Sequence, residues 1–347
     1  MRCRLPSAVS DLSSKRVRGE TKNGGDMSVM VMLAGAGIVT VLVYVVLAVV
    51  VAHLFTTPRR VQSADHAGDS YERVQFCARG ESLQLIASYR RTAAATGAVI
   101  LAHGRDACRG EELRGTTRAL VLELASRGFS VVMVDLRGHG ESDHARLTFG
   151  LRERRDILGA VDFLLHRGYR PGSIGVLGAS MGGVSAIGAA AEEHAIGALI
   201  TDSAFASLHD VLSAQFTRLT RLPSCLLAGA LFAARVLTGE DLLSHASAKN
   251  MLRLRGRPTL VIHAEHDPFV PVQHARKLAM AGACSMWITP GSRHLSSFGN
   301  TGCEYLEMVG VFFARHLGAI ETPQLTDVTD VTDVTHMADV PALAEVA

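Results

Sequence analysis

Gly178-Ala179-Ser180-Met181-Gly182 is the stretch of sequence that decides the fold. It follows the apolar run 174–177 and precedes the small-residue stretch 183–191. The order predicts a strand, a sharp turn with the pattern G-x-S-x-G, and then a helix. Such a turn strains the backbone of its central residue and tolerates only small neighbours. We therefore expect Ser180 to stand exposed at the tip of a sheet.

Short apolar, β-branched runs alternate with helical segments through residues 71–320, which predicts an α/β fold with a mostly parallel sheet flanked by helices. The predicted core strands are 98–102, 130–134, 174–177, 198–201, 259–262 and 285–289, and 73–77 with 82–89 is predicted to form an antiparallel hairpin before them. The segment 205–254 is longer than one crossover helix requires. It forms either a small helical cap over the site or additional cover for the sheet.

An apolar run near the N-terminus predicts a membrane span. Residues 28–55 contain no Asp, Glu, Lys or Arg, and the run exceeds the roughly 20 residues that a spanning helix needs. A signal peptide is the alternative, although its apolar region usually covers only about 7–15 residues. The chain is thereby divided into a polar basic leader (1–27), a transmembrane helix (28–55), a linker (56–70), the α/β domain (71–320) and a disordered tail with a Thr-Asp-Val repeat (321–347).

The charges that flank this run bear on its orientation. The basic residues before it are Lys15, Arg16, Arg18 and Lys22, and those after it are Arg59, Arg60 and Arg73. This bias favours an N-terminus inside and the α/β domain on the extracytoplasmic side. A translation start at Met27 would remove the upstream charge and favour the opposite orientation.

Composition excludes several classes of site. The six cysteines are widely spread, with no C-x-x-C pattern and no His at zinc-ligand spacing, so neither a metal site nor a dense disulfide framework is predicted. The net charge is +2 and the basic residues form no stripe interleaved with aromatics, which gives nucleic-acid binding no support. The sequence calls for no cofactor and leaves the oligomeric state open.

A serine hydroxyl is a poor nucleophile at neutral pH, so Ser180 needs a base, a group that orients the base, and donors for an oxyanion. In an open parallel sheet these groups gather beyond the carboxyl ends of the strands. Asp267 follows the strand 259–262 and is predicted to be the acid, with Glu265 and His266 as rivals in the same loop. His294 follows the last strand and is predicted to be the base.

The oxyanion donors are expected from two backbone N–H groups. His103-Gly104-Arg105 follows the strand 98–102, so the N–H of Arg105 and that of Met181 are the predicted pair, unless the segment is a plain turn. The stretch 135–142 is interpreted as a structural loop beside the site. His139 within it remains an alternative base, and Asp202 an alternative acid.

These motifs together resemble the α/β-hydrolase superfamily over about residues 71–319: H-G, D-x-R-G-x-G-x-S, G-x-S-x-G, H-x-x-x-D-x-x-V-P and a late G-x-x-H, each after a predicted strand. Within it the chain is similar to the single-spanning, membrane-anchored branch related to serine aminopeptidase-like, lipase-like and thioesterase-like hydrolases. The resemblance implies an eight-stranded sheet and the triad Ser180, Asp267 and His294. A charged Arg105 at the oxyanion position is a departure, since its side chain has to point away from the acyl pocket.

The sequence therefore predicts a serine hydrolase that cleaves a small-molecule ester, thioester or lipid through an acyl-enzyme on Ser180. The same constellation serves a peptidase or amidase, because specificity lies in the shape of the pocket. A non-catalytic, membrane-anchored scaffold that keeps the fold is the alternative from another class.

Overall fold

The computed structural model describes residues 23–61, 71–113, 117–244, 246–291 and 293–318. The predicted tail (321–347) and most of the predicted leader and linker lie outside these residues. The chain divides into two units, Met1–Val46 and Leu47–Ala347.

A single long helix, α1 (Asn23–Thr56), contains the predicted apolar span. Its stretch Met27–Thr56 has a mean hydropathy of 2.8 and is long and apolar enough to cross a membrane. A helix that is apolar on all sides is typical of such a segment. The last ten residues of α1, from Leu47 onward, belong to the second unit, where Val51 and Ala52 are buried.

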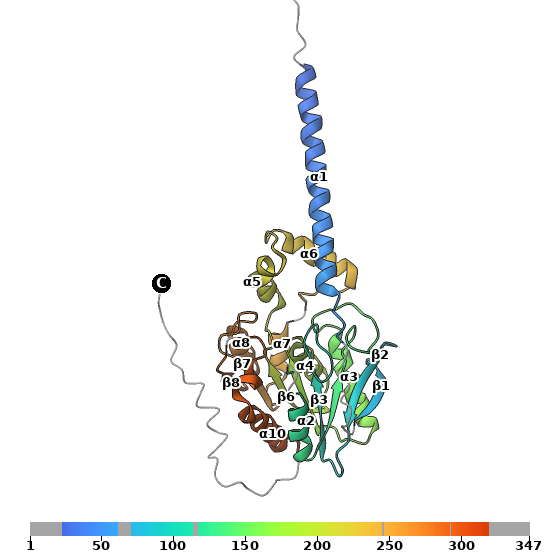
Figure 1. Ribbon diagram of the computed structural model, residues 1–347, viewed down its shortest axis with the longest axis vertical. Helices are drawn as coiled ribbons and strands as arrows, with labels where there is room; N and C mark the ends of the chain where they lie inside the picture. Colours follow the sequence, from blue (N-terminus) through green and yellow to red (C-terminus); the bar gives the residue numbers. More distant parts are fainter. Residues whose placement is uncertain (1–22, 62–70, 114–116, 245, 292, 319–347) are drawn as a thin grey trace, which may run out of the picture. The chain divides into compact units, whose positions relative to one another are not determined.

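The second unit is built on one eight-stranded sheet in the order β1-β2-β4-β3-β5-β6-β7-β8 (Figure 1). The strands are β1 (Glu72–Cys77), β2 (Gln84–Arg90), β3 (Gly97–Ala102), β4 (Phe129–Val134), β5 (Ile174–Ala179), β6 (Ile196–Asp202), β7 (Thr259–Ala264) and β8 (Ser285–Thr289). Only β2 runs antiparallel to its neighbours β1 and β4; all the other neighbouring strands are parallel. The predicted hairpin, the six predicted core strands and the mostly parallel sheet are confirmed.

Helices cover both faces of the sheet, which is why its central strands read as continuous apolar runs. The flanking helices are α2 (Thr117–Ser126), α3 (Glu153–His166), α4 (Met181–Glu192), α8 (Gln273–Gly282), the short α9 (Ser297–Thr301) and α10 (Cys303–Leu317). Along β3, Ala98, Ile100 and Ala102 join the core shared with α3, α4 and α8, whereas Val99 and Leu101 join the core shared with α2 and α10. This alternation follows from the two-residue period of a strand.

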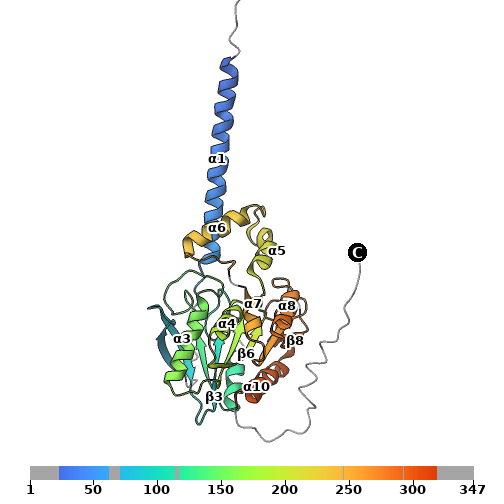
Figure 2. The ribbon, with the colours of Figure 1, turned by 180° about the vertical axis from the view of Figure 1, so that it is seen from behind.

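The predicted insertion between β6 and β7 contains α5 (Leu208–Thr220), α6 (Leu226–Thr238) and α7 (Ser247–Arg253). Figures 1 and 2 both show α5 and α6 beyond one end of the sheet, whereas α7 lies beside α4 and α8. Ser207 caps α5 by accepting a hydrogen bond from the N–H of Asp210, and Gly239 ends α6 in the left-handed conformation. The insertion thus places α5 and α6 beyond the end of the sheet and α7 against the helices α4 and α8.

Close contact between β3 and α4 brings the loop after β3 next to the turn after β5. The backbone of Gly182, in the first turn of α4, lies against the carbonyl oxygens of Ala102 and His103 at the end of β3. Any Cβ at position 182 would collide with these backbone oxygens, which cannot move aside as a flexible side chain could. The glycine therefore sets the distance between the loops that follow β3 and β5.

We expect Gly182→Ala to lower the free energy of unfolding by about 1–3 kcal/mol, the usual effect of overpacking a tight core. Thermal or urea unfolding of the detergent-solubilised chain measures the change. Gly299→Ala is the matched control, because a Cβ at position 299 would meet no atom within 4 Å. Equal stability of the two variants would contradict the close contact.

Candidate active site

Ser180, His294 and Asp267 lie in one hydrogen-bonded row. The Nε2 atom of His294 is 2.8 Å from the Oγ of Ser180, and its Nδ1 is 2.6 Å from the Oδ2 of Asp267. The side chain of Asp267 is fully buried, whereas that of His294 is 16% exposed. The row thus runs from a fully buried carboxylate to a serine that is itself only 8% exposed, so the expectation that Ser180 stands exposed at the tip of the sheet is wrong.

The backbone of Ser180 has the strained conformation that the sequence predicts. Its φ is 51° and its ψ is −115°, in the turn between the end of β5 and the start of α4. Its N–H donates to the carbonyl oxygen of Asp202 at 2.8 Å, which ties the turn to the end of β6. A non-glycine residue at positive φ is costly unless its surroundings hold it there, and such residues gather at functional sites.

Asp267 is held as an ionised acceptor. Its Oδ1 accepts the backbone N–H groups of Phe269 at 2.8 Å and Val270 at 3.0 Å. Burial raises the pKa of Asp267, but the hydrogen bond from His294 and these two N–H groups outweigh it, and the pKa lies below its usual value. Because an ionised carboxylate only accepts, Nδ1 of His294 donates to it, and Nε2 is left to accept the Ser180 proton.

A second carboxylate, Asp202, supports the loop that carries His294. It accepts hydrogen bonds from the hydroxyls of Ser203 at 2.9 Å, Tyr305 at 3.0 Å and, more weakly, Ser297 at 3.3 Å. Ser297 begins the short helix α9, three residues after His294. Burial raises the pKa of Asp202 above its usual value, whereas the pKa of Asp267 lies below its usual value.

The two predicted oxyanion donors face no competing acceptor among the described residues. The backbone N–H groups of Arg105 and Met181 have no protein hydrogen-bond partner in that part of the chain. Gly104 keeps the loop close to the nucleophile, since a Cβ there would lie 3.3 Å from the Cβ of Ser180. An unpaired pair of donors beside a nucleophile is what an oxyanion hole requires.

The rival residues have other partners. His139 is buried, with Nδ1 at 3.0 Å from the carbonyl oxygen of Arg137 and Nε2 accepting the backbone N–H of Asp106 at 3.2 Å. It positions the loop after β3, as the interpretation of stretch 135–142 expected. Glu265 and His266 have exposed side chains 3.7 Å apart. Of the two candidate acids at strand ends, Asp267 and not Asp202 is bonded to His294.

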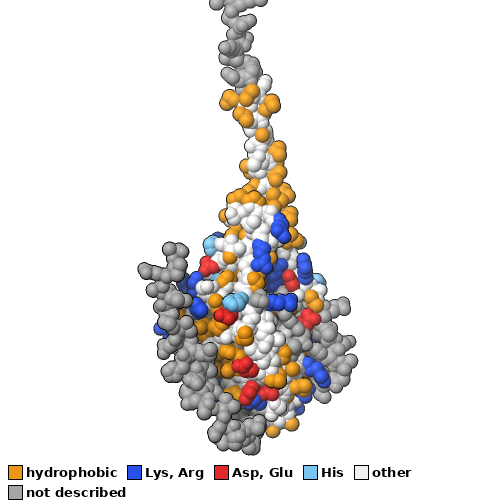
Figure 3. Space-filling model, turned by 60° about the vertical axis from the view of Figure 1, so that its left-hand side comes forward, with side chains coloured by type: hydrophobic (Ala, Val, Ile, Leu, Met, Phe, Trp, Pro, Cys, Tyr) orange, Lys and Arg blue, Asp and Glu red, His pale blue; other side chains and the backbone are white. Residues whose placement is uncertain are grey.

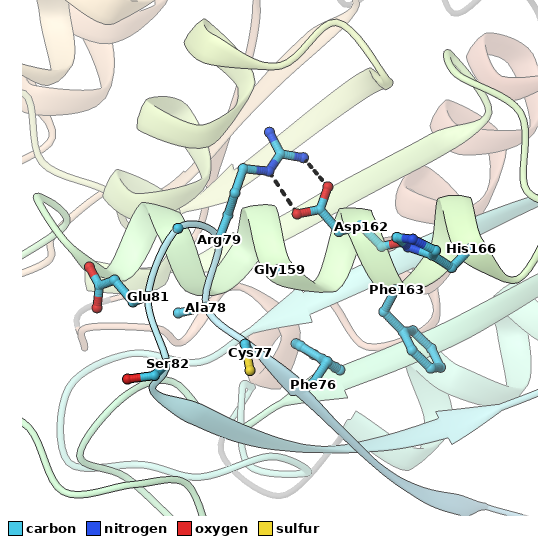
Figure 4. A pocket seen from close by; sticks show the side chains of 11 residues that line it. Phe76, Cys77, Ala78, Arg79, Glu81, Ser82, Gly159, Asp162, Phe163 and His166 are labelled. Atoms are coloured by element: carbon cyan, nitrogen blue, oxygen red, sulfur yellow. Dashed lines mark hydrogen bonds and ion pairs between the residues drawn. The ribbon is translucent and has the colours of Figure 1, made fainter.

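No cluster of three or more His, Cys, Asp or Glu able to hold a metal occurs among the described residues, and no disulfide joins the five cysteines that the structure describes to one another. A hollow of about 700 Å³ lies elsewhere, between the β1–β2 hairpin and α3 (Figure 4). In it the Arg79 guanidinium is paired with Asp162 and Glu193, so its charge is already balanced. None of the three residues of the hydrogen-bonded row lines this hollow.

The fold and the Ser, Asp, His order of the row define an α/β-hydrolase. The chain belongs to the family described as X-Pro dipeptidyl-peptidase (S15 family), which it matches over residues 62–289. The family match thus agrees with the α/β-hydrolase fold of the chain.

Two bacterial relatives share part of the sequence. YqkD of Bacillus subtilis (strain 168) is 28% identical over 189 residues, which cover 53% of this chain and 62% of that protein. YfhR of Escherichia coli O157:H7 is 27% identical over 187 residues, covering 52% of this chain and 58% of that protein. The chain therefore spans less than two thirds of the length of either relative.

Solved structures share the fold. The Pyrococcus furiosus esterase Pf2001 aligns with a TM-score of 0.62 and 22% identity, over 75% of this chain and 100% of the esterase. The Pyrococcus horikoshii acylaminoacyl peptidase aligns with a TM-score of 0.56 and 17% identity, over 76% of this chain and 44% of the peptidase. At these identities the likeness shows the α/β-hydrolase fold alone.

Sequence reasoning missed His103, whose buried imidazole shapes the loop that bears Arg105. Its Nδ1 lies 2.7 Å from the carbonyl oxygen of Gly104, and its Nε2 accepts the N–H of Leu136 at 3.1 Å. Burial and the neighbouring His139 lower the pKa of His103 to about 3. The histidine directly after β3 was the available signal, but the partner of its Nε2, Leu136, lies 33 residues away along the chain.

His103 makes stability depend on pH. Because its pKa is lower in the folded than in the unfolded state, the unfolded chain binds more protons between about pH 6.5 and pH 3, and stability falls as the pH drops through this window. We expect His103→Gln, which keeps one donor and one acceptor, to reduce the loss of unfolding free energy between pH 7 and pH 5 by about 2 kcal/mol. Urea unfolding at both pH values tests it, and parallel curves for the variant and the wild type would contradict it.

Proposed function

We propose that the protein is a serine hydrolase that cleaves a carboxylic ester or thioester through an acyl-enzyme on Ser180. The observation that carries the proposal is the row of hydrogen bonds from Ser180 through His294 to Asp267, beside two backbone N–H groups that have no partner among the described residues. A nucleophile, a base with its orienting acid, and oxyanion donors are together what acyl transfer needs.

Each group has a role in the proposed reaction. His294 Nε2 takes the proton as Ser180 Oγ attacks the carbonyl carbon, and the N–H groups of Arg105 and Met181 stabilise the oxyanion. His294 then gives the proton to the leaving alcohol or thiol, which leaves an ester on Ser180. A water molecule, deprotonated by His294, attacks this ester and releases the acid and the free serine. Asp267 keeps the imidazole in the required tautomer and stabilises its charged form.

The insertion between β6 and β7 favours an apolar acyl group as substrate. Its helix α5 contacts the loop of the acid, because Nε2 of Gln215 donates to the carbonyl oxygens of Pro268 at 2.8 Å and Phe269 at 3.1 Å. The next helix, α6, is apolar and exposes Phe232 (71%) and Val236 (69%), which lie one turn apart. This arrangement fits a cap that receives an acyl chain or a lipid.

A peptidase or amidase that uses the same groups is the second candidate. The match to the X-Pro dipeptidyl-peptidase family is the observation that favours it. Both reactions use the same nucleophile, base and oxyanion donors, so the leaving group is what distinguishes them.

We also propose that α1 anchors the protein in a membrane, with the hydrolase unit on the extracytoplasmic side. The length and hydropathy of Met27–Thr56 support the anchor. The four basic residues of the leader support the orientation. On one face of the hydrolase unit, Lys and Arg side chains lie beside hydrophobic ones, a mixture that suits a headgroup region (Figure 3).

A fluorophosphonate probe is expected to label the full-length protein, and Ser180→Ala is expected to abolish both the labelling and the hydrolysis of p-nitrophenyl esters. The turnover number should fall at least about 10⁴-fold, because the nucleophile itself is lost. Ser185→Ala is the matched control, because this hydroxyl lies within α4 and donates to the carbonyl oxygen of Met181. A folded wild-type protein that neither labels nor turns over would favour the scaffold function.

The same assay separates the two candidate reactions. Esters and thioesters of increasing acyl length are compared with Xaa-Pro p-nitroanilides. Preference for long acyl esters supports the first proposal, and faster cleavage of the anilides would replace it with the peptidase.

The membrane orientation predicts different reactivity for two cysteines. Cys303 is exposed on the hydrolase unit, and Cys3 belongs to the leader. A membrane-impermeant maleimide applied to intact cells should modify Cys303, whereas Cys3 should react only after lysis. Peptide mass spectrometry measures both sites, and the reverse pattern would place the hydrolase unit in the cytoplasm.

A further inference from the structure

The side chain of Arg105 reaches the end of α1. Its Nη2 donates to the carbonyl oxygen of Leu54 at 3.0 Å, and its Nε is 3.3 Å from Oδ2 of Asp106. Its guanidinium lies 6.0 Å from the ring centre of Phe149. The departure noted at the oxyanion position thus has a structural explanation, since the charged side chain is engaged by the helix end.

The last turn of a helix offers a natural partner for this cation. The final four carbonyl groups of a helix have no intrahelical donor, and the helix dipole places negative charge there. In α1, Leu54 is bonded to Arg105, and the carbonyl oxygen of Thr56 accepts the N–H of Leu147 at 2.7 Å. The end of α1 is therefore fastened to two loops of the hydrolase unit, one after β3 and one after β4.

Asp106, the residue after Arg105, also bonds to the chain just beyond the end of α1. Its Oδ1 accepts the backbone N–H of Arg59 at 2.8 Å, just beyond the end of α1. Its own backbone has φ of 59°, a conformation that needs support in a non-glycine residue. The N–H of Asp106 is bonded to His139, so the residue next to Arg105 is held at both its side chain and its backbone.

Apolar packing fixes the helix end in turn. Val51 and Ala52 are buried in the main core, and the ring of Phe55 meets that of Phe216 of α5 edge-on at 6.3 Å. These contacts involve only the second unit, to which residues from Leu47 onward belong.

We propose that the last turn of α1 is a working part of the oxyanion hole. It holds the Arg105 side chain, and through it the backbone N–H that Arg105 presents to the substrate oxyanion. The side chain of Arg105 is on this view a positioning group, while its N–H makes the contact. The expected effect on kcat rests on the proposed function, whereas the contact between Arg105 and the end of α1 does not depend on it.

The size of the effect follows from the role of the donor. Loss of one oxyanion donor typically lowers the turnover number about 10²–10³-fold, and a misplaced donor costs less than a missing one. Since the oxyanion forms only in the transition state, the turnover number should change and KM should not.

The test compares variants of the full-length protein in detergent, with p-nitrophenyl butyrate as substrate. Arg105→Ala keeps the backbone N–H and is expected to lower kcat about 10–100-fold with KM within about threefold of the wild type. Arg105→Lys, which keeps a cationic donor, should recover part of the loss. Phe55→Ala, which loosens the helix end without touching Arg105, should lower kcat in the same way but less. Arg315→Ala, which removes an exposed cation from the last turn of α10, is the control and should leave kcat unchanged.

Hydrogen exchange supplies a readout that needs no activity. In Arg105→Ala and Phe55→Ala, peptides covering residues 103–110 should exchange faster while the core strands keep their protection. Unchanged exchange in this loop would overturn the proposal, whatever the value of kcat. Faster exchange in the variants of an active enzyme, without a fall in kcat, would also overturn it. If the wild type does not turn over, the proposed function fails, and local exchange alone decides whether the helix end holds the loop.

Discussion

The strained turn at Ser180 is the constraint on which the rest of the site depends. A positive φ in a serine persists only where the surrounding atoms hold it, and here the ends of β3 and β6 supply those atoms. The N–H of Ser180 donates to a carbonyl oxygen at the end of β6. Gly182 is in close contact with the end of β3, and Gly104 lies against the serine side chain. The central sheet therefore holds the Ser180 hydroxyl in one orientation toward His294.

Two carboxylates at neighbouring strand ends illustrate how the surroundings set chemical roles. Asp267 receives two backbone N–H groups and the imidazole, so its pKa is lowered and it serves as a fixed negative charge. Asp202 is fully buried among hydroxyls, its pKa is raised, and it holds Ser297 and Tyr305. Pairs of groups whose pKa values are shifted in opposite directions mark a division of labour. One carboxylate contacts the base, and the other supports the loop that carries it.

Elements outside the sheet reach the same site through its loops. The insertion contacts the acid loop through Gln215, and the end of α1 contacts the oxyanion loop through Arg105. Both contacts use main-chain carbonyl oxygens, so they depend on the local backbone path more than on the identity of a partner side chain. If α1 anchors the protein, the segment that leaves the membrane and the segment that shapes the oxyanion hole are the same few residues.

The sequence by itself determined the α/β fold, the strand positions, the apolar helix and the identity of Ser180, Asp267 and His294 as candidates, because each depends on local periodicity or on position at a strand end. It left open the choice between Asp267 and Asp202 and between His294 and His139. Only the tertiary structure decided which of them bond, because hydrogen bonds between residues 27 to 114 positions apart depend on how the strands are ordered in the sheet. The hydrogen bond between Arg105 and Leu54 also depends on the tertiary structure, because no local sequence pattern predicts which helix end a long side chain will contact.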